Sequence, residues 1–516
     1  MLNLPIKILD KIISVADDEQ ITFSNIDTLV AQWDAMAKVT SRHLVLFINA
    51  RSIDVSDSIT NFLRFNGSAA MDYTYQRLSG VNAAASAGRT DGANAINLPP
   101  ICGANNVGTY GGSMVLIPHA FNTVNHKVLL ALGGASEFTV EAVAGRWASA
   151  AAITSVTMLE GVGDDYVVGS EFLLGVVDER YLVEEVDLDV AGTAIFDNIP
   201  QGYGDLAIVG FCRSDLAVTF RSIFHSINGN ITDSTRQRIY GTDGAAAASA
   251  NADQVIGRII GNNATANVFG VVAGSYSQYT RDNQPHFLMI SGGHDSVAPG
   301  GTVEVFSGRR NNIEPINKLV LLPDGGDFMA GSLFSLYRVP KRLIDRQVLT
   351  APQATITFAN IPDYYEALIL HVYARTDEAA VDDEIAITLN ADAVAANYDW
   401  QELTGAAAAM AALRNAASQQ LMYVPGDNEG ADEFGGGTVL FPNYTRTDGH
   451  KHFIVMDGQQ ENRVAISSHR WESLNAITTI ALDPVTGNNF LAGSIFELEG
   501  ILRKEGLPAD AGMRWG

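Results

Sequence analysis

The chain has 516 residues, which is too long for one hydrophobic core and suits about three domains of ~150 residues each. Its net charge of −25, from 58 acidic and 33 basic residues, argues against a nucleic-acid partner, because phosphate binding depends on clustered Lys and Arg. Hydrophobic residues make up 47% of the chain, and no apolar run approaches the ~18 residues of a membrane-spanning helix, so we expect a globular protein with an acidic, solubilising surface.

The N-terminal residues are expected to belong to the first folded unit. Met1–Pro5 has neither the charged region nor the apolar core and cleavage site of a secretory signal. Leu9–Lys11 matches Ile344–Arg346, and in both places the Asp lies thirteen residues before a Phe. The match predicts that the chain enters two equivalent units in the same way.

Short apolar runs follow one another through the first third of the chain. They are rich in Val, Ile, Leu and Phe, and clusters of Gly, Asn, Asp and Pro separate them, a pattern typical of β-strands. Helical periodicity is almost absent. The expected strands include residues 44–48, 62–65, 112–117, 128–132 and 172–174.

The same landmarks then return twice, at intervals of 162 residues. Three of them keep this interval: an Arg that ends an apolar run, an Asn that ends the next run, and a Gly-Ser pair before the last strand. A further Arg recurs less regularly, shortly before an Ile. Agreement of independent landmarks in one register indicates a tandem array of one unit. The marks are Arg51, Arg213 and Arg375; Asn66, Asn228 and Asn390; Gly169, Gly331 and Gly493; and Arg146, Arg309 and Arg470.

An Ala-rich stretch has a fixed place in each copy, after Gly80, Gly241 and Gly405. Its sequence changes from copy to copy, which predicts a loop that varies among the units and either carries contacts or is a passive surface insertion. In the third copy the stretch continues as Met410–Arg414. Because Ala and Leu favour helices, we expect a short helix there.

These patterns predict an all-β protein of three tandem antiparallel β-sandwich domains, jelly-roll-like, with eight or nine strands each. The expected domains are residues 1–177, 178–340 and 341–506, followed by a short tail at 507–516. The linkers are short and contain no flexible Gly/Ser tether. The domains should therefore be held close together, either as a compact triad or as a stiff row.

No catalytic motif stands out. The acidic groups lie in Gly-rich turns, where Asp is common for local hydrogen bonding, so paired glycosidase carboxylates are not favoured. They are Asp164-Asp165, Asp324 with Asp327, and Asp382-Asp383-Glu384. We expect no catalytic residue and no cofactor.

Metal sites and disulfides are likewise not expected. His450 and His452 would share one strand face, but no third ligand is evident, and Asp324–Asp327 is too short for an EF-hand loop. Cys102 and Cys212 fall at different places in the repeat, so we expect no disulfide and synthesis in a reducing cytosol.

Arg51, Arg213 and Arg375 each end an apolar strand in the same place. A guanidinium presents five donors in a fixed fork, which suits it to holding loop carbonyls or a carboxylate. We interpret these residues as structural clamps.

The order Phe-x-Asn-Ile-Pro, apolar run, Arg-Ser/Thr, Phe/Leu-Asn-Gly and closing Ala-Gly-Ser-x-Phe-x-Leu resembles a family of tailed-bacteriophage virion structural proteins. The third copy, with Ala492–Phe496, and the second, with Ala330–Tyr337, fit best. The first departs, with Asp27 in place of the Pro and Val168 before its Gly-Ser. The resemblance implies β-sandwich modules on the phage particle, as a capsid decoration (cement) protein or as a fibre or tail component.

The expected function is that of a non-enzymatic capsid decoration protein on the virion surface, made in the host cytoplasm. Its expected partners are other virion proteins, the major capsid protein first among them, with no nucleic acid and no membrane; self-association stays open. The alternative is a fibre or receptor-binding protein that recognises host-surface carbohydrate through aromatic platforms. The candidate platforms are Tyr73, Tyr75, Trp147, Trp400 and Trp471.

Overall fold

The computed structural model contains three modules of strands, each with one large and one small sheet. Module 1 runs from β1 to β12, module 2 from β13 to β24 and module 3 from β25 to β36. The expected tail at 507–516 and the end of the second linker lie outside the described residues. The described residues are 3–161, 163–202, 204–281, 283–295, 300–339, 343–459 and 462–502.

Module 1 also contains a helix, and modules 2 and 3 each contain one turn of 3₁₀-helix. The elements of module 1 are β1 (Ile6–Ile13), β2 (Gln20–Phe23), α1 (Ile26–Ala37), β3 (Leu44–Ala50), β4 (Ser58–Phe65), β5 (Tyr73–Val81), β6 (Ala84–Ala93), β7 (Ile96–Cys102), β8 (Gly111–Ile117), β9 (Lys127–Ala135), β10 (Thr139–Trp147), β11 (Val156–Glu160) and β12 (Glu171–Val177). Those of module 2 are η1 (Glu179–Tyr181), β13 (Leu182–Asp187), β14 (Ala194–Phe196), β15 (Leu206–Cys212), β16 (Phe220–Ile227), β17 (Ser234–Thr242), β18 (Ala245–Asn251), β19 (Val255–Ile260), β20 (Gly270–Ser277), β21 (His286–His294), β22 (Gly301–Arg310), β23 (Leu319–Pro323) and β24 (Leu333–Arg338). Those of module 3 are β25 (Leu343–Val348), β26 (Ile356–Phe358), β27 (Tyr365–Ala374), β28 (Asp382–Leu389), η2 (Ala395–Asn397), β29 (Tyr398–Ala406), β30 (Ala409–Asn415), β31 (Gln420–Pro425), β32 (Gly435–Pro442), β33 (Lys451–Gln459), β34 (Arg463–Trp471), β35 (Ile480–Pro484) and β36 (Ile495–Leu502).

Each module is an antiparallel β-sandwich of jelly-roll type. In module 1 the large sheet has the order β1-β12-β3-β8-β9-β10-β5-β6 and the small sheet the order β2-β11-β4-β7. Without the inserted hairpins β5-β6 and β9-β10, two four-stranded sheets remain in the connectivity of a jelly roll. Modules 2 and 3 repeat both orders, so the predicted fold class is confirmed.

The predicted eight or nine strands per module were too few, because each module has twelve in the described part of the chain. One of the missed strands in each module is the Ala-rich stretch, which was expected to be a loop. β6, β18 and β30 pair with β5, β17 and β29 as edge strands of the large sheets. The helix expected at Met410–Arg414 is therefore wrong. Pairing to β29 and packing against the neighbouring modules outweigh the weak helix preference of Ala and Leu.

The prediction of almost no helix missed α1, which only module 1 has among the described residues. Its sequence carried the signal, because Ile26, Val30 and Trp33 recur at helical spacing and are the buried residues of the helix.

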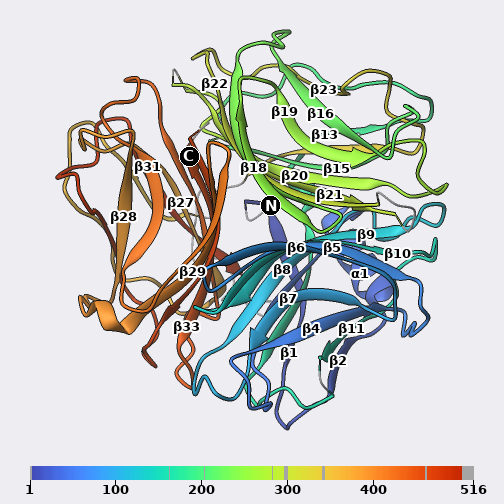
Figure 1. Ribbon diagram of the computed structural model, residues 1–516, viewed down its shortest axis with the longest axis horizontal. Helices are drawn as coiled ribbons and strands as arrows, with labels where there is room; N and C mark the ends of the chain where they lie inside the picture. The colour runs from blue at the N-terminus through green and yellow to red at the C-terminus, as the bar shows by residue number, and fades with distance from the viewer. Residues whose placement is uncertain are drawn as a thin grey trace.

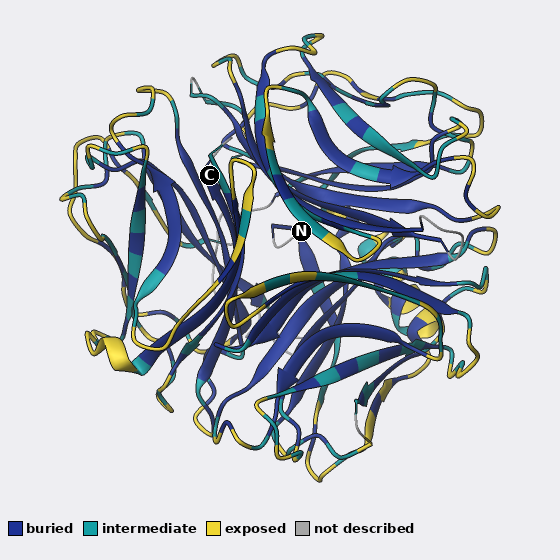
Figure 2. Ribbon diagram, viewed as in Figure 1, coloured by how far each residue is buried: buried dark blue, intermediate teal, exposed yellow. Residues whose placement is uncertain are grey.

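The three modules surround a pseudo-threefold axis (Figure 1), so the compact triad and not the stiff row is the observed arrangement. The large sheets face inward and the small sheets face outward. Figure 2 shows the sheets as buried, with exposed residues in the peripheral loops and along the central hairpins. One apolar core is shared by all three modules and includes Leu78, Ile239 and Leu403, which are fully buried at equivalent places on β5, β17 and β29.

The continuous apolar runs of the sequence follow from this double burial. On β3, Val45 and Phe47 point into the shared central core, whereas Leu44, Leu46 and Ile48 point into the core between the two sheets of module 1. A strand that is buried on both faces needs apolar residues at every position.

Candidate functional site

Two of the three regular landmarks, the Arg that ends an apolar run and the Gly-Ser pair, are in contact in each module. In module 2 the backbone N–H of Arg213 donates to Ser332 Oγ at 3.2 Å. Ser332 is held in place by Gly331, whose φ of +83° lies in the left-handed region that favours glycine. The same contact joins Arg51 to Ser170 at 3.1 Å and Arg375 to Ser494 at 3.2 Å.

The side chains of these arginines hold one loop in each module. Arg213 donates to the carbonyl oxygens of Thr265 and Ala264, both at 2.8 Å, and to that of Asn262 at 3.2 Å. Arg375 makes three such bonds and Arg51 one at 3.4 Å. The loop between β19 and β20 is thereby attached to the end of β15. This is the geometry of a structural clamp.

The repeated asparagines are turn residues. Asn228 has a φ of +52°, and its Oδ1 accepts the backbone N–H groups of Asn317 and Lys318 at 3.0 and 3.1 Å. Its Nδ2 donates to Pro315 O at 2.9 Å. Asn66 and Asn390 make equivalent bonds. Each Asn therefore fastens the loop that precedes the strand equivalent to β23.

The fourth set of landmarks, Arg146, Arg309 and Arg470, joins the modules to one another. Arg146 of module 1 pairs with Asp295 of module 2 at 3.1 Å, and Arg309 of module 2 pairs with Glu433 of module 3. Arg470 of module 3 lies 3.5 Å from Glu137 of module 1. The three contacts run from one module to the next and close a ring. The sequence marked these arginines but did not identify their partners.

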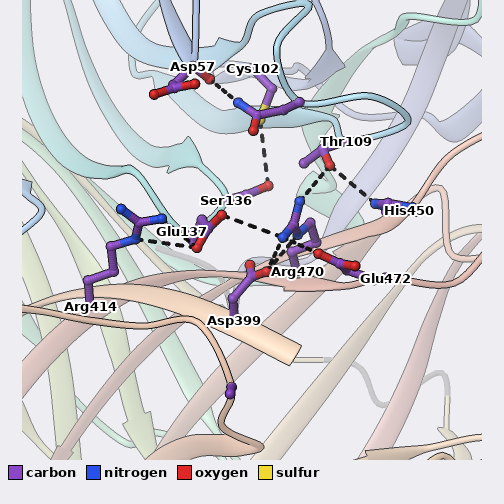
Figure 3. Close-up of polar contacts among 12 residues, drawn as sticks. Asp57, Cys102, Thr109, Ser136, Glu137, Asp399, Arg414, His450, Arg470 and Glu472 are labelled. Atoms are coloured by element: carbon purple, nitrogen blue, oxygen red, sulfur yellow. Dashed lines mark hydrogen bonds and ion pairs between the residues drawn. The ribbon is translucent and has the colours of Figure 1, made fainter. Parts of the chain in front are cut away.

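The 3–1 interface, where modules 3 and 1 meet, shows the fullest version of this contact (Figure 3). Arg470 Nε donates to Asp399 Oδ2 at 2.7 Å and Nη1 to Thr109 Oγ1 at 3.0 Å. Thr109 Oγ1 also lies 3.2 Å from His450 Nδ1. Burial raises the pKa of Asp399 to about 7, although Arg470 opposes the shift. Loss of one partner would leave an uncompensated charge in this buried network, so the network favours one arrangement of modules 1 and 3.

This network offers little to a substrate. Thr109, the only hydroxyl that contacts Arg470 among the described residues, is fully buried. No group of three or more His, Cys, Asp or Glu residues in the described part of the chain is placed to hold a metal ion. Two small cavities lie elsewhere at module interfaces, with volumes of about 30 Å³ beside Leu4 and Ile501 and about 10 Å³ beside Gln278 and Tyr373. Spaces of this size hold a water molecule or two.

The other candidate residues have local partners. His450 contacts module 1, whereas His452 is buried and bonds to Ser468 Oγ at 3.0 Å, so the two imidazoles have separate partners. Asp383 accepts the backbone N–H groups of Thr486 and Gly487 at 3.1 and 3.0 Å, which is turn chemistry. Both cysteines are free and buried.

The five aromatic side chains proposed as sugar platforms are buried and therefore present no face to solvent. The exposed fractions of these residues are 0% for Tyr73, 9% for Tyr75, 5% for Trp147, 5% for Trp400 and 1% for Trp471.

One acidic residue in each module was missed by the sequence analysis. Trp147 Nε1 donates to Asp72 at 3.0 Å and Trp471 Nε1 to Asp392 at 2.8 Å. In module 2, Arg310 takes the place of the Trp and donates to Asp233 at 2.9 Å. The Arg can replace the Trp because both present an N–H to the same carboxylate. The recurrence of these acids, at intervals close to 160 residues, was the available signal.

No family model and no curated protein matches the chain. Three solved structures to which the chain is weakly similar have TM-scores far below 0.5, so they carry no argument. A mutant of the Rh. blastica porin is 11% identical over 78% of this chain and 98% of its own, with a TM-score of 0.09. OpdL of Pseudomonas aeruginosa is 8% identical over 83% and 99%, with a TM-score of 0.10, and the 12:0-ACP thioesterase of Umbellularia californica is 8% identical over 49% and 77%, with a TM-score of 0.08. In the described part of the chain, none of the helices has the length and apolarity to cross a membrane.

Proposed function

We propose that the protein is a non-enzymatic structural component of a phage virion, in the first place a capsid decoration protein that binds the head and stabilises it. The observation that carries the proposal is the closed ring of three similar modules around a shared apolar core, built from one chain. One chain thereby presents three related surfaces about one axis, as a homotrimer would.

This architecture suits attachment to a threefold or quasi-threefold position of a shell. Once one module has bound, the other two contacts become intramolecular, with effective concentrations that reach the millimolar range for short connections. Contacts that are individually weak then add up to firm attachment.

The buried contacts between modules support the same function. Arg146 and Asp295 are 3% and 0% exposed, so the modules are fixed before any partner arrives. A preorganised binder loses less conformational entropy on binding than three flexibly linked modules would. The carbohydrate alternative has no comparable support, since its five candidate platforms are buried.

Binding to purified, expanded phage heads tests the proposal. We expect the protein to co-sediment with the shells, to saturate at a stoichiometry set by their threefold positions, and to raise the temperature at which the shells disrupt. Absence of binding together with unchanged shell stability would overturn the proposal. Adsorption to host cells or to a glycan array, without binding to heads, would favour the fibre alternative.

A further inference from the structure

Histidines are concentrated at the interface between modules 1 and 2, the 1–2 interface. Of the ten histidines in the sequence, four lie there, three from module 1 and one from module 2. The 2–3 interface has His371 and the 3–1 interface has His450. The remaining four, His225, His286, His452 and His469, bond within their own modules. The four at the 1–2 interface are His43, His119, His126 and His294.

His43 is held in its neutral form by hydrogen bonds. Its Nδ1 accepts the backbone N–H of His119 at 3.2 Å, and its Nε2 lies 3.3 Å from Ser335 Oγ of module 2. A proton on Nδ1 would place two N–H groups face to face and break the first bond. Burial, together with His119 and Arg42, lowers the pKa of His43 to about 3.

His119 is held in the same way and contacts module 2 with its ring. Its Nδ1 accepts from Asn122 Nδ2 at 3.1 Å, and the Asn orientation is fixed because its Oδ1 accepts two backbone N–H groups. The imidazole meets the ring of Phe211 edge-on at 5.3 Å. Burial lowers the pKa of His119 to about 4, and the nearby Arg42 and Lys127 act in the same direction.

His294 of module 2 inserts among charged side chains of module 1. It is 1% exposed, and neither ring nitrogen has a hydrogen-bond partner among the described residues. Its Nε2 lies 3.6 Å from Asp91 Oδ1. Burial lowers the pKa of His294 to about 3, with Arg89 and Arg146 acting in the same direction and Asp295 opposing them.

His126 completes the set. Its backbone N–H donates to Asn267 O of module 2 at 3.0 Å, and its Nδ1 has no hydrogen-bond partner in the described part of the chain. Burial lowers the pKa of His126 to about 4, with Arg146 and Lys127 in the same direction and Asp295 in the opposite one.

The carboxylates at this interface are already engaged by arginines. Asp295 pairs with Arg146, Asp91 and Asp243 pair with Arg89, and Glu185 pairs with Arg42. A new imidazolium would therefore enter a cluster whose negative charges are shared with cations. Glu179 acts on the interface in the opposite direction to the four histidines. Burial raises its pKa to about 7, so the carboxyl takes up a proton as the pH falls, and this protonation stabilises the closed interface. The charged groups that face the histidines are Arg42, Arg89, Lys127, Arg146, Asp91 and Asp295.

We propose that the 1–2 interface is a pH-sensitive contact, which opens on acidification before the 3–1 interface. The closed interface holds four neutral imidazoles, whereas an opened interface exposes them to water, where histidine titrates near 6.5. The advantage of the closed form is complete above pH ~6.5 and is lost as the pH falls toward 4 for His119 and His126 and toward 3 for His43 and His294. At pH 5 each fully shifted histidine raises the ratio of open to closed forms by about thirtyfold.

At the 3–1 interface the titratable groups act in both directions, and the carboxyls oppose the single histidine. Burial, with Arg470 in the same direction, lowers the pKa of His450, so protonation of this imidazole disfavours the closed form. The pKa values of Asp399 and Glu171 there are raised by burial, so these carboxyls take up protons in the closed form and stabilise it on acidification. Lys11, which bridges Glu171 and Glu366 at 2.6 and 2.7 Å, keeps a carboxylate partner as long as one of the two is ionised. The proposed pH response of the 1–2 interface does not depend on the proposed virion function.

Hydrogen exchange of the full chain, read by mass spectrometry and corrected for the intrinsic pH effect, tests this pH response. Between pH 8 and pH 5 we expect residues 119–127 and 264–268, on the two sides of the 1–2 interface, to lose protection first. Residues 106–110 at the 3–1 interface should keep theirs. Equal loss at the 1–2 and 3–1 interfaces, or loss at 106–110 first, would overturn the proposal.

Two variants connect the opening to the histidines. His126→Gln, at a half-buried position, and His294→Gln, at a buried one, should each reduce the pH-dependent increase in opening by up to about thirtyfold. His452→Gln, inside module 3, is the matched control and should leave opening of the 1–2 interface unchanged. If neither His126→Gln nor His294→Gln alters the pH dependence of exchange at residues 119–127, the proposal is wrong; His126→Gln decides the matter if His294→Gln fails to fold.

Discussion

Arg146 of module 1 and Asp295 of module 2 form an ion pair of 3.1 Å that solvent does not reach, since the side chains are 3% and 0% exposed. The carboxylate also accepts the backbone N–H of Thr265 at 2.7 Å. Such a pair adds little net stability compared with apolar residues of the same size, but either partner left alone is a buried, uncompensated charge.

Asp295→Ala should therefore lower the free energy of unfolding by about 3–5 kcal/mol, because Arg146 is left buried and unpaired. Arg146→Met should have a similar effect, and the double variant should lose much less than the sum of the two. Urea unfolding followed by intrinsic fluorescence measures all three. The pair of Arg221 and Asp324, 3.4 Å apart and 29% and 47% exposed, is the control, and the same substitutions there should change stability by less than about 1 kcal/mol. Additive effects at Arg146 and Asp295 would contradict the interpretation.

Gly405 is required by the close approach of modules 3 and 2. A Cβ at this position would lie 2.4 Å from Ile239 Cγ2 and 3.0 Å from Ala248 Cβ, both in module 2. Gly405→Ala should therefore destabilise the protein by about 1–3 kcal/mol through overpacking. Gly80→Ala, where the nearest atom is Leu403 Cβ at 3.1 Å, should have a smaller effect.

Thermal unfolding of the two glycine variants measures this difference. Adding Ile239→Ala to Gly405→Ala removes the clashing methyl group, so the double variant should be more stable than the sum of the single effects predicts. An increase in stability for Gly405→Ala, as expected where alanine fits without strain, would show that the modules do not pack this closely.

The sequence predicted the sandwich fold and the repeat because both arise from local patterns: apolar runs buried on both faces, and landmarks such as Asn228 and Gly331 that need a particular backbone conformation. It did not predict what holds the modules together. Arg146 and its partner Asp295 are 149 residues apart and have no common motif, so only the closed ring brings them together. The Ala-rich strands were missed for the same reason, since β6, β18 and β30 are stabilised by packing around the axis and not by their own strand preference. The contact of Asp72 was not predicted, because the sequence around an acidic residue in a turn does not show whether the indole N–H of a Trp donates to it.

His225 gives a pH-dependent prediction within module 2. Its Nδ1 lies 2.9 Å from Tyr276 Oη and its Nε2 3.0 Å from Ser234 Oγ, and burial lowers its pKa to about 3. Because the folded pKa lies below the unfolded value of ~6.5, the contribution of His225 to stability is complete above pH 6.5 and is lost as the pH falls from there toward 3. His225→Gln, which does not titrate, should be less stable than the parent at pH 7.5. The difference should shrink by about 2 kcal/mol at pH 5. Urea unfolding at both pH values measures it, and a constant difference would mean that the imidazole is not neutral in the folded protein.

Arg213 allows the clamp to be separated from any role in binding a partner. Arg213→Lys keeps the positive charge but loses the fork that reaches Ala264, Thr265 and Asn262 together, so the loop between β19 and β20 should lose hydrogen-exchange protection in both Arg213→Lys and Arg213→Ala. If Arg213 acted only through its positive charge, Arg213→Lys would keep the normal exchange protection of the loop.

The destabilisation should be about 1–3 kcal/mol for Arg213→Ala, because several carbonyls lose a charged donor at once. Arg51→Ala is the internal comparison. Arg51 makes a single loop-carbonyl bond at 3.4 Å, so its loss should be smaller. If Arg213→Ala folds with normal stability and loop protection but no longer binds phage heads, the residue belongs to the contact surface and the clamp interpretation is wrong.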